Sequence, residues 1–158
     1  MGLVKFHKDL IVYQKSFSSA MEIYLISRKF PREETCSLTD QILRSSRSVS
    51  ANITEAWRKR RYEKSFVAKL TDADGEAAET QNWLDFAFAC KYITEDEHSK
   101  LFALYDEILA LLVSMVNSSE KWTFSAEKKK SENSITHNSN TPNSNTPNSN
   151  TPNSNPKK

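Results

Sequence analysis

A run of four basic residues, Arg58-Lys59-Arg60-Arg61, gives this sequence its clearest candidate for a binding function. Basic side chains bind nucleic-acid phosphates and aromatic rings stack on unpaired bases, so a run flanked by Trp57 and Tyr62 suits RNA or DNA. Two other interpretations stay open: the run is a solvated helix turn, or it meets the acidic surface of a second copy of the chain. The candidate nucleic-acid-binding residues are Trp57, Arg58, Lys59, Arg60, Arg61, Tyr62 and Lys64, with Arg44 and Arg47 as secondary candidates.

Catalytic patterns are weak by comparison. The segment from Glu95 to His98 contains the Glu-x-x-His spacing of di-iron bundles. Such sites need two of these motifs and two further glutamates, and the sequence has a single motif, so we predict no metal site. The glycines, Gly2 and Gly75, provide no Gly-rich loop for a phosphate. We therefore predict a protein that is not an enzyme and holds no cofactor.

An acidic face is expected on the third predicted helix, at Asp72, Asp74, Glu76 and Glu79. A solvated face or a subunit contact is the simplest interpretation of these carboxylates. Glu79 is expected to turn inward, because it lies one turn beyond Gly75, where the missing side chain lets a neighbouring helix approach. A buried carboxylate needs a partner, and Arg44 or Arg47 is the expected one.

The elements that position these residues are predicted to be helices, because apolar residues recur every three or four positions. The expected helices cover Asp9–Phe30, a segment that ends near Trp57, Tyr62–Tyr92, and a segment that opens at Thr94 with a capping box to Glu97. Pro31 marks the first turn. These segments predict an all-α fold, an antiparallel up-down-up-down four-helix bundle with a disordered C-terminal tail.

The predicted core consists of the apolar residues on one face of each helix. In the first helix these are Leu10, Tyr13, Phe17, Ala20 and Tyr24, and in the second Leu38, Ile42, Val49 and Ile53. In the third they are Phe66, Leu70, Ala73, Ala77, Leu84, Ala87 and Phe88, and in the fourth Leu101, Leu104, Tyr105, Ile108, Leu111, Leu112 and Met115.

Of the 158 residues, those from 4 to 124 are expected to form the bundle domain and those from 125 to 158 the tail. The tail repeats Asn-Ser-Asn-Thr-Pro and has few apolar groups, so it cannot offset the entropy of ordering. Cys36 and Cys90 are too few for a disulfide framework, and we expect reduced thiols that pack on helices. The N-terminus does not resemble a signal peptide and no apolar run would span a membrane, so the expected location is the cytoplasm.

The formal net charge of +2 hides an uneven distribution. Residues 28–69 hold eleven Lys and Arg and five Asp and Glu, a balance of +6, whereas residues 70–126 hold three and eleven, a balance of −8. Opposite charges on two parts of one domain suit a head-to-tail ring of copies. The same ring would gather several basic turns on one rim, where they could bind a nucleic acid together.

The order and spacing of several residues, over roughly residues 6–121, resemble a bacterial protein family. These residues are Phe6, Asp9, Leu10, Phe30, Pro31 and Glu34, then Leu38, Gln41, Arg44, Ser48, Asn52 and Glu55, then Ala73, Gly75 and Glu79. The family comprises small four-helix-bundle proteins first noticed as reading frames within intervening sequences of large-subunit ribosomal RNA genes. The accessory variability determinant of diversity-generating retroelements is a more distant relative. The sequence departs from the family pattern at Ala56, where Gly is usual, and at Glu76, where Ser is common.

The resemblance implies a homopentamer in which bundles pack side by side around a channel. For the retroelement relatives it implies binding of nucleic acid and of a reverse transcriptase through basic surfaces. It implies no enzymatic activity. We therefore expect a homo-oligomeric protein that binds RNA or DNA. The alternative is a protein-interaction scaffold with no nucleic-acid contact.

Overall fold

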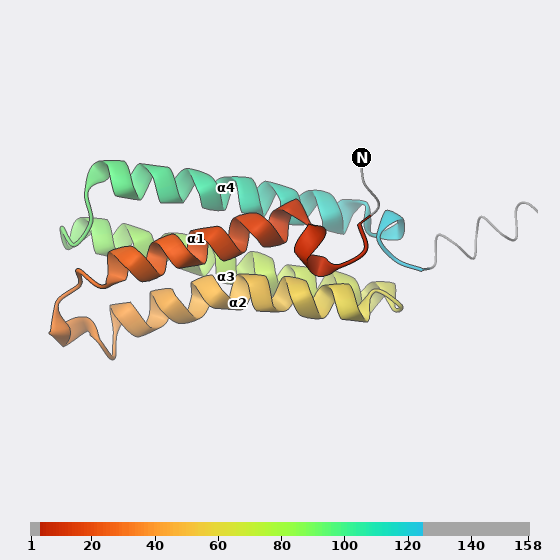
Figure 1. The fold of residues 1–158 in the computed structure, drawn as a ribbon, viewed down its shortest axis with the longest axis horizontal. Coiled ribbons are helices and arrows are strands. Elements are labelled where there is room, and N and C mark those ends of the chain that lie inside the picture. Colours follow the sequence, from red (N-terminus) through yellow and green to blue (C-terminus); the bar gives the residue numbers. More distant parts are fainter. Residues whose placement is uncertain (1–3, 125–158) are drawn as a thin grey trace, which may run out of the picture.

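The computed structural model describes residues 4–124, which form an antiparallel bundle of four long helices (Figure 1). The helices are α1 (Ile11–Ser27), α2 (Leu38–Lys59), α3 (Glu63–Ala89) and α4 (Glu95–Asn117). Three 3-10 helices, η1 (His7–Asp9), η2 (Arg32–Glu34) and η3 (Ser119–Lys121), precede α1, connect α1 to α2 and follow α4. Both α1 and α3 pack against α2 and α4, so the helices surround one core. The predicted fold is confirmed, and the predicted tail lies outside the described residues.

Glu34 caps the N-terminus of α2 from the preceding turn. Its carboxylate accepts hydrogen bonds from the Ser37 hydroxyl, from the Leu38 amide at 3.2 Å and from the Tyr92 hydroxyl at 3.1 Å. The Ser37 bond and then the Leu38 bond lower the pKa of Glu34, because both favour the charged carboxylate. This cap lies just after the Pro31 turn and fixes where α2 begins.

The predicted capping box at the start of α4 is confirmed. The Thr94 hydroxyl accepts the Glu97 amide N–H at 3.2 Å, and the Glu97 carboxylate accepts the Thr94 amide N–H at 3.0 Å. The Lys29 ammonium also donates to Glu97, and this bond is the main reason that the pKa of Glu97 is lowered. Just before α4, Lys91 adopts a left-handed φ of 61°, which ends α3 at Ala89 rather than at the predicted Tyr92.

The predicted core of α2, α3 and α4 is largely confirmed. All four predicted residues of α2 are buried, and Phe88 is the one predicted residue of α3 that is exposed. In α4, Leu104 and Leu111 are half-buried and the other five are buried. Small polar side chains complete the interior between α2 and α3, where the Thr80 hydroxyl donates to the Ser45 hydroxyl at 2.9 Å. Such small groups let α2 and α3 approach closely, and they form the most extensive helix pair of the bundle.

The predicted core face of α1 is confirmed for Leu10 and Ala20, which are buried, but is wrong for the three aromatic residues. Phe17 and Tyr24 are 52% and 38% exposed, and Tyr13 is only half-buried. The face that does meet the core is lined by Val12, Ser16, Ser19, Ala20, Ile23, Ile26 and Ser27. Apolar residues cover nearly the whole circumference of α1, so their spacing fits more than one face. The serines decide between the faces, because their small side chains allow closer helix contact.

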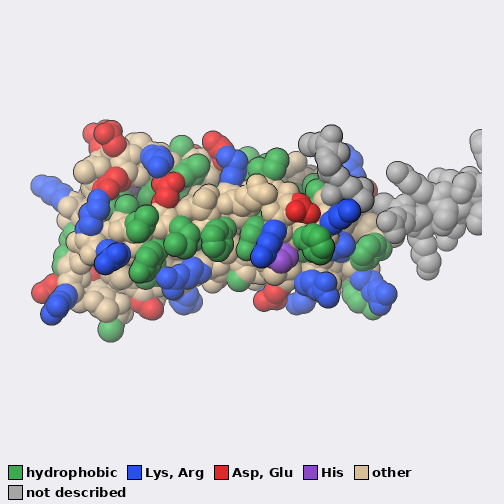
Figure 2. Space-filling model, in the orientation of Figure 1, with side chains coloured by type: hydrophobic (Ala, Val, Ile, Leu, Met, Phe, Trp, Pro, Cys, Tyr) green, Lys and Arg blue, Asp and Glu red, His purple; other side chains and the backbone are tan. Residues whose placement is uncertain are grey.

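The outer face of α1 carries a continuous row of exposed apolar side chains, visible along the helix in Figure 2. We call it the α1 row; it comprises Phe17, Met21, Tyr24 and Leu25, each at least 38% exposed. Their spacing of four, three and one residues keeps them on one side of the helix. Within residues 4–124, no helix is long and apolar enough to cross a membrane.

Candidate nucleic-acid interface

The basic run lies at one end of the bundle, where α2 ends and α3 begins. Arg58 and Lys59 form the last turn of α2, Arg60 and Arg61 lie in the connecting turn, and Lys64 lies in the first turn of α3. We call this the basic end. Further exposed lysines lie in the segments that pack at the same end, because η1 contacts α1 and α2 and η3 contacts α3. They are Lys5, Lys8 and Lys121.

Three cations of the basic end have no acidic partner within the described residues. Arg58, Arg61 and Lys64 are exposed, and residues 4–124 place no carboxylate within 4.0 Å of them. Lys59 differs, since its ammonium lies 3.5 Å from a Glu55 carboxylate oxygen. Tyr62, beside these cations, is 66% exposed. An exposed aromatic ring among unpaired cations is the combination that binds phosphates and stacks on bases.

Trp57 and Arg60 have a structural role at this end. Trp57 is only 6% exposed, and the Arg60 guanidinium lies 3.9 Å from the centre of its ring. Arg60 also lies 4.8 Å from the Phe124 ring centre and donates to the Trp57 carbonyl at 2.9 Å. The covered Trp57 ring therefore offers no face for a base, and Tyr62 is the candidate for stacking.

The secondary candidates, Arg44 and Arg47, lie on α2 away from the basic end. Arg44 is exposed, donates to Gln41 at 2.6 Å and lies 3.7 Å from the Glu79 carboxylate. The predicted pair with Glu79 therefore exists, but as a surface pair with side chains 58% and 36% exposed rather than as a buried one. Arg47 is also exposed and lies 6.0 Å from the ring centre of Tyr24. Neither arginine belongs to the basic end.

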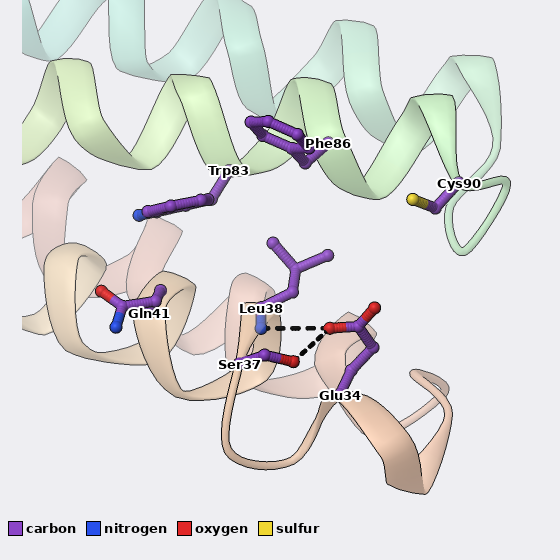
Figure 3. Close-up of a pocket in the computed structure, with 7 residues that line it drawn as sticks. All are labelled: Glu34, Ser37, Leu38, Gln41, Trp83, Phe86 and Cys90. Atoms are coloured by element: carbon purple, nitrogen blue, oxygen red, sulfur yellow. Dashed lines mark hydrogen bonds between the residues drawn. The ribbon is translucent and has the colours of Figure 1, made fainter.

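Two hollows lie on the surface between α2 and α3, and we call them together the α2–α3 groove. The first, its apolar end, is a pocket of about 570 Å³ lined by Glu34, Ser37, Leu38, Gln41, Trp83, Phe86 and Cys90 (Figure 3). The second, its polar end, is lined by Asn52, Lys69, Thr71, Asp72, Gly75, Glu76 and Glu79. Gln41 and Asn52, which belong to the family pattern, thus face the surface.

Ion pairs and hydrogen bonds connect α2 and α3 along the polar end of this groove. The Lys69 ammonium lies 3.1 Å from Asp72, 3.3 Å from Glu55 and 3.2 Å from the Asn52 side-chain oxygen. The bonds to Asp72 and Glu55 raise the pKa of Lys69, and the Lys69 bond lowers the pKa of Glu55. Exposed pairs of this kind stabilise a fold only slightly.

Gly75 and Glu76 correct one expectation about this region. A Cβ atom at Gly75 would meet nothing within 4 Å among residues 4–124, so the missing side chain serves no contact between the described helices. Glu76 has a carboxylate oxygen that is hidden from solvent and has no hydrogen-bond partner within the described residues. Burial raises the pKa of Glu76, and the Glu79 charge raises it further.

The reactive side chains of His98, Cys36 and Cys90 lie at the bundle end opposite the basic end. His98 lies 2.7 Å from Asp85 and stacks near Phe88 and Phe102, with ring centres 4.9 and 5.4 Å away. Within residues 4–124, no three His, Cys, Asp or Glu side chains form a group that could hold a metal. Cys36 and Cys90 are exposed and lie in turns, so the expectation that they pack on helices is wrong.

Residues 8–114 match the family model described as 23S rRNA-intervening sequence protein. The chain belongs to this family. A solved structure of a protein of unknown function from the S23 ribosomal protein family of Bacteroides thetaiotaomicron is similar, with 32% sequence identity and a TM-score of 0.62. The match covers 68% of this chain and 100% of that one. No curated protein matches the sequence.

Sequence reasoning found the basic run but missed the α1 row as a surface. Met21 and Leu25 did not enter the predicted core, and Phe17 and Tyr24 were expected inside it. The signal in the sequence was the excess of apolar residues around α1, more than one buried face requires.

Proposed function

We propose that this family member is a non-catalytic, homo-oligomeric protein that binds RNA or DNA through the basic end of its bundle. The observation that supports the proposal is the cluster of Arg58, Arg61 and Lys64, which lack acidic partners within residues 4–124 and lie beside the exposed ring of Tyr62. Structural cations on a surface are usually paired or spread out. Three unpaired cations around an aromatic ring fit a polyanion with bases.

Self-association would increase the affinity for nucleic acid. One basic end offers only a few contacts to phosphates, and each neutralised phosphate contributes a modest, salt-dependent share of the affinity. A closed ring of copies that point the same way would place all basic ends on one rim. The ring predicted from the family resemblance, a pentamer, is therefore part of the proposal. Recruitment of a reverse transcriptase stays a prediction that no described feature tests.

The test compares two charge-reversal variants by binding to short labelled RNA and DNA strands. Arg58→Glu with Arg61→Glu changes the basic end, and Arg32→Glu with Lys100→Glu makes the same charge change at the opposite end of the bundle. We expect the first pair to weaken binding by roughly tenfold or more and to reduce its salt dependence, because phosphate contacts are lost. The second pair should bind like the wild type. Helicity by circular dichroism should be the same in both variants.

Equal affinities for the two variants would contradict the assignment of the basic end. A wild-type protein that binds neither RNA nor DNA at low salt would contradict the function itself. That outcome would favour the alternative of a protein-interaction scaffold, for which the exposed α1 row is the supporting observation.

A further inference from the structure

We propose that the α1 row of one copy packs along the α2–α3 groove of a second copy that points the same way. Repetition of this contact would close the ring, and the proposal rests on the self-association in the proposed function. It assigns the two surfaces that meet and the register between them.

The first surface is the α1 row, which faces outward. Phe17, Met21 and Leu25 are 52%, 47% and 58% exposed, although α1 also has a complete buried face. Large apolar side chains exposed in a row are costly in water and mark a surface that is covered by a partner. Figure 2 shows that this row runs along α1, at the centre of the visible face.

The second surface is the apolar end of the α2–α3 groove. Phe86 is 53% exposed and its ring centre lies 5.7 Å from that of the half-buried Trp83. In Figure 3, both aromatic side chains project from α3 over the gap that the Leu38 side chain enters from α2. The groove is therefore open, and its walls are of the apolar kind that the α1 row would cover.

The α1 row and the apolar end of the α2–α3 groove lie at the same level along the bundle axis. α1 and α3 both end at the bundle end opposite the basic end (Figure 1). At 1.5 Å per residue, Tyr24 lies about 4–5 Å and Met21 about 9 Å before the end of α1, and Phe86 and Trp83 lie at the same distances before the end of α3. In two copies that point the same way, the apolar residues of one would face the aromatic residues of the other.

The same register explains the unoccupied space at Gly75. Tyr13 and Gly75 each lie about 21 Å before the ends of α1 and α3. No atom of the described part of the chain lies within 4 Å of a Cβ atom placed at Gly75, whereas Tyr13 presents a half-buried ring next to the α1 row. The ring of one copy would fill the space above the glycine of the next.

Charge complementarity favours a second copy over another protein as the occupant. Arg47 lies beside the α1 row, about 14 Å from the start of α2, and Glu79 lies at about 15 Å from the end of α3. The cation flanking the α1 row of one copy would therefore approach the acidic wall of the α2–α3 groove of the next, which also holds the unpartnered Glu76 oxygen. An arginine there would donate a charge-assisted hydrogen bond to the partly exposed Glu79 carboxylate.

The contact is heterologous, because the α1 row and the α2–α3 groove are different surfaces. Each copy keeps one unused α1 row and one unused groove until the arrangement closes on itself. Bundles that point the same way would then bring all basic ends onto one rim.

Disulfide crosslinking tests the contact directly. In a Cys36→Ser background, Leu25→Cys would place a thiol in the α1 row, and the natural Cys90 lines the α2–α3 groove. Mild oxidation should then produce a ladder of covalent dimers, trimers and larger species on a denaturing gel. Adding Cys90→Ser should abolish all species larger than a dimer. Ser99→Cys in the same background places a thiol on α4 near the same end of the bundle, and it should give no ladder.

The molar mass from light scattering gives the second readout. Met21→Glu with Leu25→Glu should reduce the assembly to a monomer, while Val113→Glu, on an equally exposed apolar residue of α4, should leave its mass unchanged. A ladder that persists without Cys90, or an assembly that survives the Met21 and Leu25 changes, would overturn this contact. A monomeric wild type would overturn the ring as well. Nucleic-acid binding by the basic end is tested separately, by the variant with Arg58→Glu and Arg61→Glu.

Discussion

α1 and α2 lie side by side in the same bundle, but they use their surfaces in different ways. α2 buries its apolar residues and exposes polar ones, so its inner and outer faces differ sharply in character. α1 buries small serines together with aliphatic residues and exposes Phe17, Met21, Tyr24 and Leu25. Folding buries the large apolar residues of α2 apart from the half-buried Leu43, but only part of those of α1.

Contacts within one copy of the chain therefore explain the apolar residues of α2 better than those of α1. A helix that is apolar all round is normally buried all round. In α1, only one side is covered by α2 and α4. We propose that a second copy covers the other side. The same excess of apolar residues made the inner face of α1 the hardest of the four to predict.

The largest expected effect is a difference in stability between substitutions on the buried side and on the exposed side of α1. Ile23, fully buried, and Met21, 47% exposed, lie two residues apart. Ile23→Ala should lower the free energy of unfolding by about 2–5 kcal/mol, since it leaves a cavity in the core. Met21→Ala should change it by less than about 0.5 kcal/mol in the dissociated chain. Urea unfolding at two protein concentrations provides the measurement.

Protein concentration distinguishes the two variants. Ile23→Ala should be destabilised at both concentrations, and Met21→Ala only at the concentration at which copies associate, because association stabilises the folded state. A large, concentration-independent loss for Met21→Ala would mean that the outer side of α1 is part of the monomer's core.

The second largest effect concerns the capping of the N-termini of α1 and α2. The Glu34 carboxylate caps the N-terminus of α2, whereas the N-cap residue of α1, Leu10, makes no side-chain capping bond. Because the pKa of Glu34 is lowered in the folded state, its stabilising contribution is present above its ordinary value of 4.5 and is lost as the pH falls through the lowered value. Glu34→Gln should therefore lower the Tm at pH 7, and its difference from the wild type should shrink as the pH falls below 4.5.

The neighbouring Glu33→Gln provides the control, since it makes the same charge change at an exposed position of η2. Its Tm should follow that of the wild type across the pH range. If Glu33→Gln and Glu34→Gln behaved alike, the acid dependence would come from general charge rather than from the cap of α2.

The smallest effect concerns Gly75, on the surface that we propose receives α1. Since a Cβ atom there meets nothing and alanine favours helix, Gly75→Ala should stabilise the dissociated chain by about 0.5–1 kcal/mol. The same change should weaken association if the Tyr13 ring of a neighbour occupies this space. Thermal unfolding and light scattering of one sample measure both. A less stable dissociated chain would show that Gly75 serves a contact within the monomer.

The sequence predicted the fold well where local signals were unambiguous. The Phe30-Pro31 turn, the Thr94–Glu97 capping box and the apolar faces of α2 and α3 each have one physical interpretation. The position of the basic run, at the turn after α2, was also predictable from its place between two helices.

Other features depended on distances that a sequence does not contain. The face of the Trp57 ring is covered by Arg60, whose guanidinium lies 3.9 Å from the ring centre. The location of Gly75 on an open surface depends on which side of α3 meets α2. The inner face of α1 was ambiguous because the choice between its two apolar sides rests on the packing of serines against other helices.

An even number of helices returns the chain to the end at which it started, so Val4 and Phe124 both lie beside the basic end. Any fluorophore attached at Val4 or Phe124 would therefore lie next to the surface whose binding is to be measured. The natural thiols of Cys36 and Cys90 lie at the other end, about a helix length of 33 Å away. A dye or surface tether attached at Cys36 would leave the basic end facing the solution and also avoid the α2–α3 groove that Cys90 lines.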